Sequence, residues 1–133
     1  MLNNNEILDA DKTSINIKNK FDLVDSRVMI APGYICSNGS NEISNLGRGG
    51  SDYSASIFAK YCNAKCLEIW TDVSGVFSAN PKIVEKASPI DFLSYKEAME
   101  LSFFGAKVIY FPTLQPLIAV SYTHLTLPTI LLV

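Results

Sequence analysis

The feature that most constrains this chain is a short glycine-rich loop directly before a helical pattern. The loop reads LGRGGSDY over residues 46–53 and combines three glycines with Arg48 and Asp52. Glycine permits a left-handed backbone and lets a ligand approach the peptide groups. A helix N-terminus adds free N–H donors and the positive end of a dipole, and Arg48 adds a planar fork suited to a carboxylate or phosphate. The stretch predicts an anion site on a strand–loop–helix unit, with a flexible surface turn as the alternative.

The segments around the loop alternate between strand and helix patterns. Apolar runs at residues 28–31 and 66–70 are typical of buried strands, and the polar stretch 37–45 is expected to form a hairpin. Behind the loop, apolar residues at helical spacing predict a helix with Ser51 as its N-cap. Its apolar face consists of Ala55, Phe58, Ala59 and Cys62. This rhythm favours an α/β fold with a mostly parallel sheet.

The remaining segments are predicted from local signals. Ser94 and Glu97 form a capping box that opens a helix to about Phe104, with Gly105 as its stop. Residues 1–26 show weak periodicity and are expected to hold loops, a strand or a short helix. Residues 106–110 read as a third strand and residues 113–119 as a short helix.

The last segment, residues 120–133, departs from this pattern. It carries no charged side chain, shows no helical face and resembles the adapter read-through that ends some environmental gene fragments. We therefore expect residues 1–119 to form part of a domain and residues 120–133 to be non-native.

Composition excludes several classes of protein. Apolar residues make up 48% of the chain and the net charge is −2, which favours a folded domain and gives no electrostatic reason to expect nucleic acid or a membrane. No apolar run is long enough to span a membrane, and no secretory signal is visible. The three cysteines form no zinc pattern and are expected to be reduced thiols, as in a cytoplasmic protein.

The charged residues allow chemistry on phosphates. Phosphoryl transfer needs backbone donors, cations for the developing charge and a fixed acidic group. Asp72 follows a predicted strand, where open α/β sheets bind ligands, whereas Lys107 taken alone is better explained as a lysine that snorkels. No P-loop, GxGxxG fingerprint or nucleophile triad is present. The candidate cations are Arg48, Lys82 and Lys107, and the candidate acids are Asp52 and Asp72.

Three long motifs in order and spacing resemble aspartate kinases of the amino-acid kinase superfamily. They are LGRGGSDYSASIFA, LEIWTDVSGVFSANPK and LSYKEAMELSFFGAKVIY, within a resemblance that runs from about Met29 to about Ile118. The third motif looks most like the bifunctional aspartate kinase–homoserine dehydrogenase branch. The resemblance implies a three-layer α-β-α sandwich with a mostly parallel sheet. Residues 1–119 would be the C-terminal, nucleotide-binding part of this amino-acid kinase domain.

The resemblance also implies roles by position. Asp52 and Lys107 would be catalytic, with Asp52 orienting the lysines and Lys107 stabilising the transferring phosphoryl group. Phe77 stands where tyrosine is usual, and Lys82 stands where arginine is usual, which weakens the expected phosphate contact. No residue is implied as a metal ligand. The implied aspartate-binding residues are Arg48, Gly49, Gly50, Ser51 and Asp52, and the implied nucleotide-binding residues are Thr71, Asp72, Phe77, Lys82, Lys107 and Val108.

The implied reaction is phosphorylation of L-aspartate by ATP with Mg²⁺, giving ADP and 4-phospho-L-aspartate. This is the first step of lysine, threonine and methionine biosynthesis, in an enzyme expected to be a homo-oligomer. The family's Lys-Phe-Gly-Gly-Thr-Ser motif with its catalytic lysine is absent, as are its aspartate-binding glutamate and its regulatory ACT domains. We therefore expect the isolated chain to be marginally stable and to have little or no activity. The alternatives are another amino-acid kinase, acting on glutamate, acetylglutamate, carbamate or a nucleotide, and a non-catalytic binding module.

Overall fold

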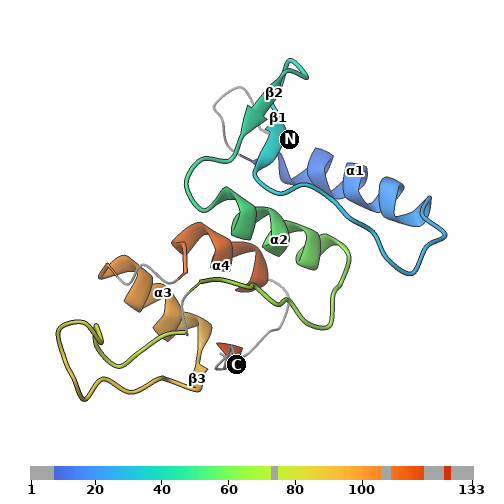
Figure 1. Ribbon diagram of the computed structural model, residues 1–133. Coiled ribbons are helices and arrows are strands. Elements are labelled where there is room, and N and C mark those ends of the chain that lie inside the picture. Colours follow the sequence, from blue (N-terminus) through green and yellow to red (C-terminus); the bar gives the residue numbers. More distant parts are fainter. Residues whose placement is uncertain (1–7, 73–74, 106–108, 119–124, 127–133) are drawn as a thin grey trace.

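The structure is a computed structural model that describes residues 8–72, 75–105, 109–118 and 125–126. Over these residues the chain forms helices joined by long connections, with two short antiparallel ladders (Figure 1). The helices are α1 (Ala10–Asp22), α2 (Gly50–Tyr61), α3 (Tyr95–Phe103) and α4 (Phe111–Ile118). The strands are β1 (Ile35–Ser37), β2 (Ile43–Asn45), β3 (Phe92–Leu93) and β4 (Leu125–Thr126).

Helix α2 is the centre of the packing. It lies between α1 and α4, and α3 packs against the far side of α4 (Figure 1). Burying one large aliphatic side chain stabilises a fold by roughly 1.5–3 kcal/mol. A core with few such side chains therefore contributes little to the free energy of unfolding. The buried apolar side chains are Ile57, Ala59, Val76, Leu93, Ala98, Leu114 and Leu117.

The helix predicted from the capping box is confirmed. The Ser94 hydroxyl accepts a hydrogen bond from the backbone N–H of Glu97 at 3.2 Å, and the Glu97 carboxylate accepts one from the backbone N–H of Ser94 at 2.8 Å. Gly105, with φ +100°, follows the helix end as predicted. In the weakly patterned N-terminal region the structure contains α1, which Asp9 caps through a 3.0 Å bond from the N–H of Lys12.

The helix that follows the glycine loop is also confirmed, but its start was predicted wrongly. Ser51 is not the N-cap; Gly49 is, with φ +68°. Because glycine adopts this left-handed conformation without strain, the helix can begin two residues earlier than the side-chain preference of Ser51 indicated. The short helix predicted at 113–119 is confirmed as α4, whose Pro116 is buried in the core.

The hairpin predicted within residues 37–45 is confirmed. Strands β1 and β2 pair antiparallel, with Cys36 opposite Ser44. The turn is fixed by Asn38, whose side-chain oxygen accepts hydrogen bonds from the N–H groups of Ser40 and Glu42 at 3.0 and 2.9 Å. The glycine loop begins directly after β2, the second strand of this hairpin.

Two predicted strands are wrong as local assignments. Residues 28–31 and 66–70 form no ladder with another described segment, and Ile30 and Trp70 are 94% and 74% exposed. A parallel strand is stable only when neighbours satisfy its backbone groups and cover its faces. The described part of the chain supplies no such neighbours for these two segments. The ladders that it does contain, β1–β2 and β3–β4, are both antiparallel.

The third predicted strand, residues 106–110, falls mainly outside the described residues. Of it, Ile109 and Tyr110 are described and lie in a connection before α4. The segment 120–133 is likewise outside apart from β4, which pairs antiparallel with β3.

Candidate functional site

The glycine loop, residues 46–53, joins β2 to the first turn of α2 and has a fixed backbone. Gly47 and Gly49 have φ of +70° and +68°. The N–H of Gly47 donates to the Asn45 side chain at 3.0 Å, and the N–H of Gly50 donates to the carbonyl of Gly47 at 3.0 Å. Glycine adopts this left-handed conformation without the steric cost that other residues carry. These two glycine conformations and two hydrogen bonds define the shape of the loop.

The N-terminus of α2 is open to a ligand. No side chain caps it. The N–H of Gly50 is bonded to the carbonyl of Gly47, so the donors left for a ligand in the first turn are those of Ser51 and Asp52. Arg48 and Ser51 are exposed beside it, and Asp52 is half-buried in the first turn. A negative charge at Asp52 also stabilises the helix start by itself. The arrangement suits an anionic ligand held by backbone donors and Arg48.

Close packing around Gly49 and Gly50 restricts the loop further. A Cβ at Gly49 would lie 2.5 Å from Cγ of Tyr110 and 2.6 Å from its Cβ. A Cβ at Gly50 would lie 2.9 Å from Cβ of Leu46 and 3.0 Å from a ring carbon of Tyr34. Both glycines are therefore needed for close approach, and at Gly49 the approaching group is an aromatic ring.

A buried hydroxyl connects α2 to the turn before β1. The Ser54 hydroxyl accepts a hydrogen bond from the N–H of Tyr34 at 2.9 Å and donates one to the carbonyl of Gly50 at 2.8 Å. Tyr34 has φ +72°, a costly conformation for an aromatic residue. Neither Ser54 nor Tyr110 was found by reasoning from the sequence. The sequence signal that could have indicated them is their closeness to predicted site residues: Ser54 is two positions after Asp52, and Tyr110 is three positions after Lys107.

The predicted nucleotide-binding residues lie on two exposed connections. Thr71 and Asp72 are both exposed, and the Thr71 hydroxyl donates to the Asp72 carboxylate at 3.3 Å. Phe77 is half-buried and forms an isolated antiparallel β-bridge with Pro89. Lys82 is exposed in a turn where its N–H donates to the side chain of Asn80 at 3.0 Å.

The structure brings together only part of the predicted set. Arg48, Gly49, Gly50, Ser51 and Asp52 are contiguous at the start of α2, and Thr71 contacts Asp72. Within the described residues no hydrogen bond or ion pair joins the glycine loop to Thr71, Asp72, Phe77 or Lys82. Lys107 and Val108 lie outside the described residues.

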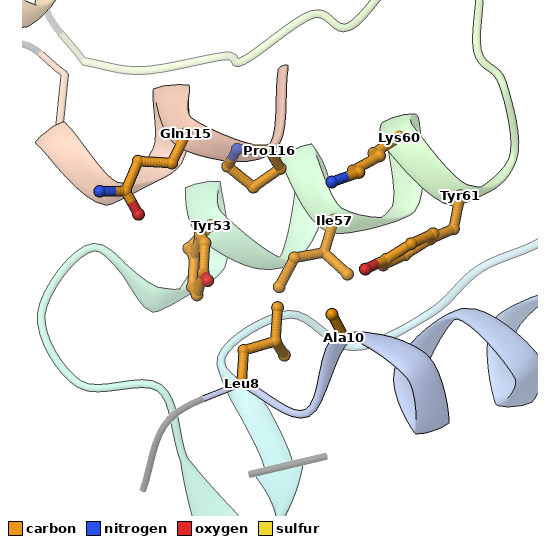
Figure 2. Close-up of a pocket in the computed structure, with 8 residues that line it drawn as sticks. All are labelled: Leu8, Ala10, Tyr53, Ile57, Lys60, Tyr61, Gln115 and Pro116. Carbon is orange, nitrogen blue, oxygen red and sulfur yellow. The ribbon is translucent and has the colours of Figure 1, made fainter. Parts of the chain in front are cut away.

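A pocket of about 180 Å³ opens beside the site, between the start of α1, α2 and α4 (Figure 2). Burial, with smaller contributions from Tyr61 and Tyr110, raises the pKa of Tyr53 above its ordinary value of 10. The ammonium of Lys60 lies 5.5 Å from the centre of the Tyr61 ring. The lining residues are Leu8, Ala10, Tyr53, Ile57, Lys60, Tyr61, Gln115 and Pro116.

Neither a metal-ligand cluster nor a membrane-spanning helix is present among the described residues. They contain no group of three His, Cys, Asp or Glu side chains placed to hold a metal ion. Of the helices described, none is long and apolar enough to cross a membrane.

Comparison with known proteins defines the class. The sequence profile of the amino acid kinase family matches residues 3–124. The chain belongs to the amino acid kinase family. This confirms the resemblance found in its motifs.

The relatives are more specific. The chain is 43% identical over 110 residues to the bifunctional aspartokinase/homoserine dehydrogenase of Buchnera aphidicola, covering 83% of this chain and 13% of that protein. It is 42% identical over 89 residues to the lysine-sensitive aspartokinase 3 of Escherichia coli, covering 67% of this chain and 20% of that protein. The chain thus spans a fifth or less of the length of these two relatives.

Solved structures confirm the fold class. E. coli aspartokinase III in complex with aspartate and ADP matches 84% of this chain with a TM-score of 0.70 and 34% identity. The aspartate kinase of Clostridium acetobutylicum matches 87% with a TM-score of 0.73 and 35% identity. The chain covers 24% and 26% of those two chains. The amino-acid kinase type of α/β fold is therefore shown, although the ladders described here are antiparallel.

Proposed function

We propose that this chain is the glycine-loop and nucleotide-binding part of an aspartate kinase. The enzyme transfers the terminal phosphoryl group of ATP to the side-chain carboxylate of L-aspartate, giving ADP and 4-phospho-L-aspartate. The observation that carries this proposal is the open N-terminus of α2 with Arg48 exposed beside it. It stands in a chain 34% identical to an aspartokinase solved with aspartate and ADP.

The glycine loop is proposed to hold the amino acid. Arg48 binds a substrate carboxylate through two parallel hydrogen bonds, which its planar fork favours. The N–H groups of Ser51 and Asp52 lie in the first turn of α2, where negative charge is stabilised. Asp52 orients the cations around the transferring group, as the resemblance implies.

The other residues are proposed to serve the nucleotide. Thr71, Asp72 and Phe77 contact the nucleoside, and Lys82 contacts phosphate. Lys107 and Val108, which lie outside the described residues, keep the nucleotide-binding roles that the resemblance implies.

The magnesium ion has few protein ligands in this proposal. In phosphoryl-transfer enzymes Mg²⁺ is commonly held by substrate phosphates with one or two carboxylates. The phosphates of ATP would therefore be the chief ligands of the ion here. It would supply charge neutralisation.

The decisive experiment is an assay of the full-length protein that contains this chain. Acyl phosphate formed from ATP is trapped with hydroxylamine in the presence of aspartate, glutamate, acetylglutamate or carbamate. We expect product with aspartate, and product only with another acceptor would reject the proposal in favour of a different amino-acid kinase. The isolated 133-residue chain is expected to give little or none, because it lacks the family's catalytic lysine motif and losing one member of a set of groups that act as a unit can remove most of the catalysis.

Two arginine variants locate the substrate site. Losing a hydrogen bond to a charged group costs about 1.5–3 kcal/mol, so Arg48→Ala is expected to raise the KM for aspartate by about 10- to 100-fold. Arg27→Ala is the matched control, since Arg27 is also exposed but lies outside the loop. Equal effects of the two substitutions would show that Arg48 does not bind the substrate.

The extent of the kinase part is also proposed. Residues 1–119 are assigned to the kinase domain and residues 120–133 to a foreign tail, although the family profile extends to residue 124. Sequencing the gene from genomic DNA tests this, because a native tail would be read again in the same frame.

A further inference from the structure

The ring of Tyr110 fills the space beside Gly49. A Cβ at position 49 would lie 2.5 Å from Cγ of Tyr110 and 2.6 Å from its Cβ and Cδ1. Such distances are shorter than any that real Cβ atoms adopt, so a side chain at 49 and this ring cannot coexist without movement. Gly49 is the N-cap of α2, and the contact therefore lies at the point where the loop becomes helix.

Gly47 shows what the loop is like without such a contact. Its φ of +70° is nearly the same as that of Gly49, yet nothing lies within 4 Å of a Cβ added there. The left-handed strain on an added side chain is therefore similar at the two positions, and position 49 differs in its contact with Tyr110 and in being the N-cap of α2. The two glycines separate the effect of conformation from the effect of packing.

Tyr110 is held in place from its own side as well. Its carbonyl accepts a hydrogen bond from the N–H of Thr113 in the first turn of α4 at 2.9 Å. The carbonyl of the preceding residue, Ile109, accepts one from the Ser102 hydroxyl of α3 at 3.1 Å. The ring is thus presented to the loop by a backbone fixed to two helices, α3 and α4.

We propose that Tyr110 is a positioning residue for aspartate: its ring buttresses Gly49 and holds Arg48 and the first turn of α2 in their binding geometry. This inference rests on the proposed function. Tyr110 itself touches no substrate in it. A displacement of about 1 Å at a binding group can cost up to 100-fold in rate, so the loss of a buttress is measurable.

The test uses kinetics of the full-length enzyme that contains this chain. Tyr110→Ala is expected to raise the KM for aspartate by about tenfold and the KM for ATP by less than about twofold. Tyr110→Phe keeps the ring and is expected to retain the KM of the unchanged enzyme. A Phe variant as impaired as the Ala variant would overturn the proposal, because the hydroxyl rather than the ring would then matter.

A double-mutant cycle tests the contact itself. Gly49→Ala is expected to impair aspartate binding more than Gly47→Ala, since only position 49 meets the ring. In the Tyr110→Ala background the difference between the two alanine substitutions should become smaller, because Cγ and Cδ1 are removed and only the Cβ of residue 110 remains close to position 49. Equal effects in the unchanged background, or an unchanged difference in the Tyr110→Ala background, would overturn the proposal.

A readout independent of activity separates this inference from the proposed function. Hydrogen exchange at the N–H groups of Gly50 and Tyr53, which bond to the carbonyls of Gly47 and Gly49 at 3.0 Å, reports the order of the loop. Tyr110→Ala should accelerate both and Tyr110→Phe neither. An enzyme that phosphorylates another acceptor would reject the aspartate assignment while this exchange result stands, and unchanged exchange in Tyr110→Ala would reject the buttress alone.

Discussion

The backbone N–H of Tyr34 donates a 2.9 Å hydrogen bond to the hydroxyl of Ser54, which donates in turn to the carbonyl of Gly50 at 2.8 Å. One buried hydroxyl thus joins the turn before β1 to the first turn of α2. It supports a backbone at Tyr34 that has φ +72°. The first turn of α2 is consequently anchored, through Ser54, to a residue 20 positions earlier in the chain.

Ser54→Ala should loosen this anchor. The substitution leaves the part-buried N–H of Tyr34 without its acceptor, and the loss of one such hydrogen bond costs about 0.5–1.5 kcal/mol. Hydrogen exchange at Tyr34 should accelerate accordingly. Ser56→Ala is the matched control, because Ser56 is also buried and its hydroxyl only donates to the Tyr53 carbonyl within α2. Similar exchange at Tyr34 in both variants would contradict the anchor.

Sequence reasoning found the parts of the fold that local chemistry decides. Ser94 and Glu97 lie within one helical turn, so their reciprocal capping needs nothing distant. The hairpin that ends at β2 is similar, since Asn38 fixes its own turn. By contrast, Ile30 and Trp70 belong to segments whose strand character depends on neighbours far away or not described, and local β-propensity does not supply these.

The residues of the candidate site also divide into those that the local sequence predicts and those that depend on distant neighbours. The glycine loop with Arg48 was visible because glycine and arginine have distinctive chemistry at short spacing. The buttress at Tyr110 was not, because nothing in the sequence shows which ring will lie against Gly49. The side-chain preference of serine predicts an N-cap at Ser51. In the structure the helix begins earlier, because Gly49 adopts a left-handed backbone and is the N-cap itself.

The capping box should make the stability of α3 depend on pH. Hydrogen bonds from the hydroxyl and backbone N–H of Ser94 hold the pKa of Glu97 below its ordinary value of 4.5. Because the folded-state pKa is the lower one, this contribution is present above the ordinary pKa and is lost as pH falls through the lowered value. Carboxyl NMR titration of Glu97 should show the low pKa, and Ser94→Ala should raise it. A Glu97 that titrates at its ordinary value would show that the box does not form in solution.

Two cysteines near the end of α2 should differ in reactivity. Burial, with a smaller contribution from Asp22, raises the pKa of the Cys62 thiol, whereas Cys66 is exposed. The thiolate is the reactive form, so Cys62 should alkylate more slowly near neutral pH and accelerate as pH rises toward its raised pKa. Peptide mass spectrometry after a short iodoacetamide pulse resolves the two sites, with a denatured sample as the control. Equal labelling in the native chain would argue that the end of α2 is not packed as described.

Lys82 offers a prediction of improved binding. Its turn is set by Asn80, whose side chain accepts the N–H of Lys82 and whose carbonyl accepts those of Ile83 and Val84, so a longer side chain can be exchanged without moving the backbone. Arginine keeps the charge and adds a bidentate fork for phosphate. If one further hydrogen bond of about 0.5–1.4 kcal/mol forms, Lys82→Arg should lower the KM for ATP in the full-length enzyme by about two- to tenfold. Lys86→Arg, at an exposed lysine four positions later, should leave it unchanged. An unaltered KM in Lys82→Arg would remove Lys82 from the phosphate site, while leaving the assignment of aspartate to the glycine loop intact.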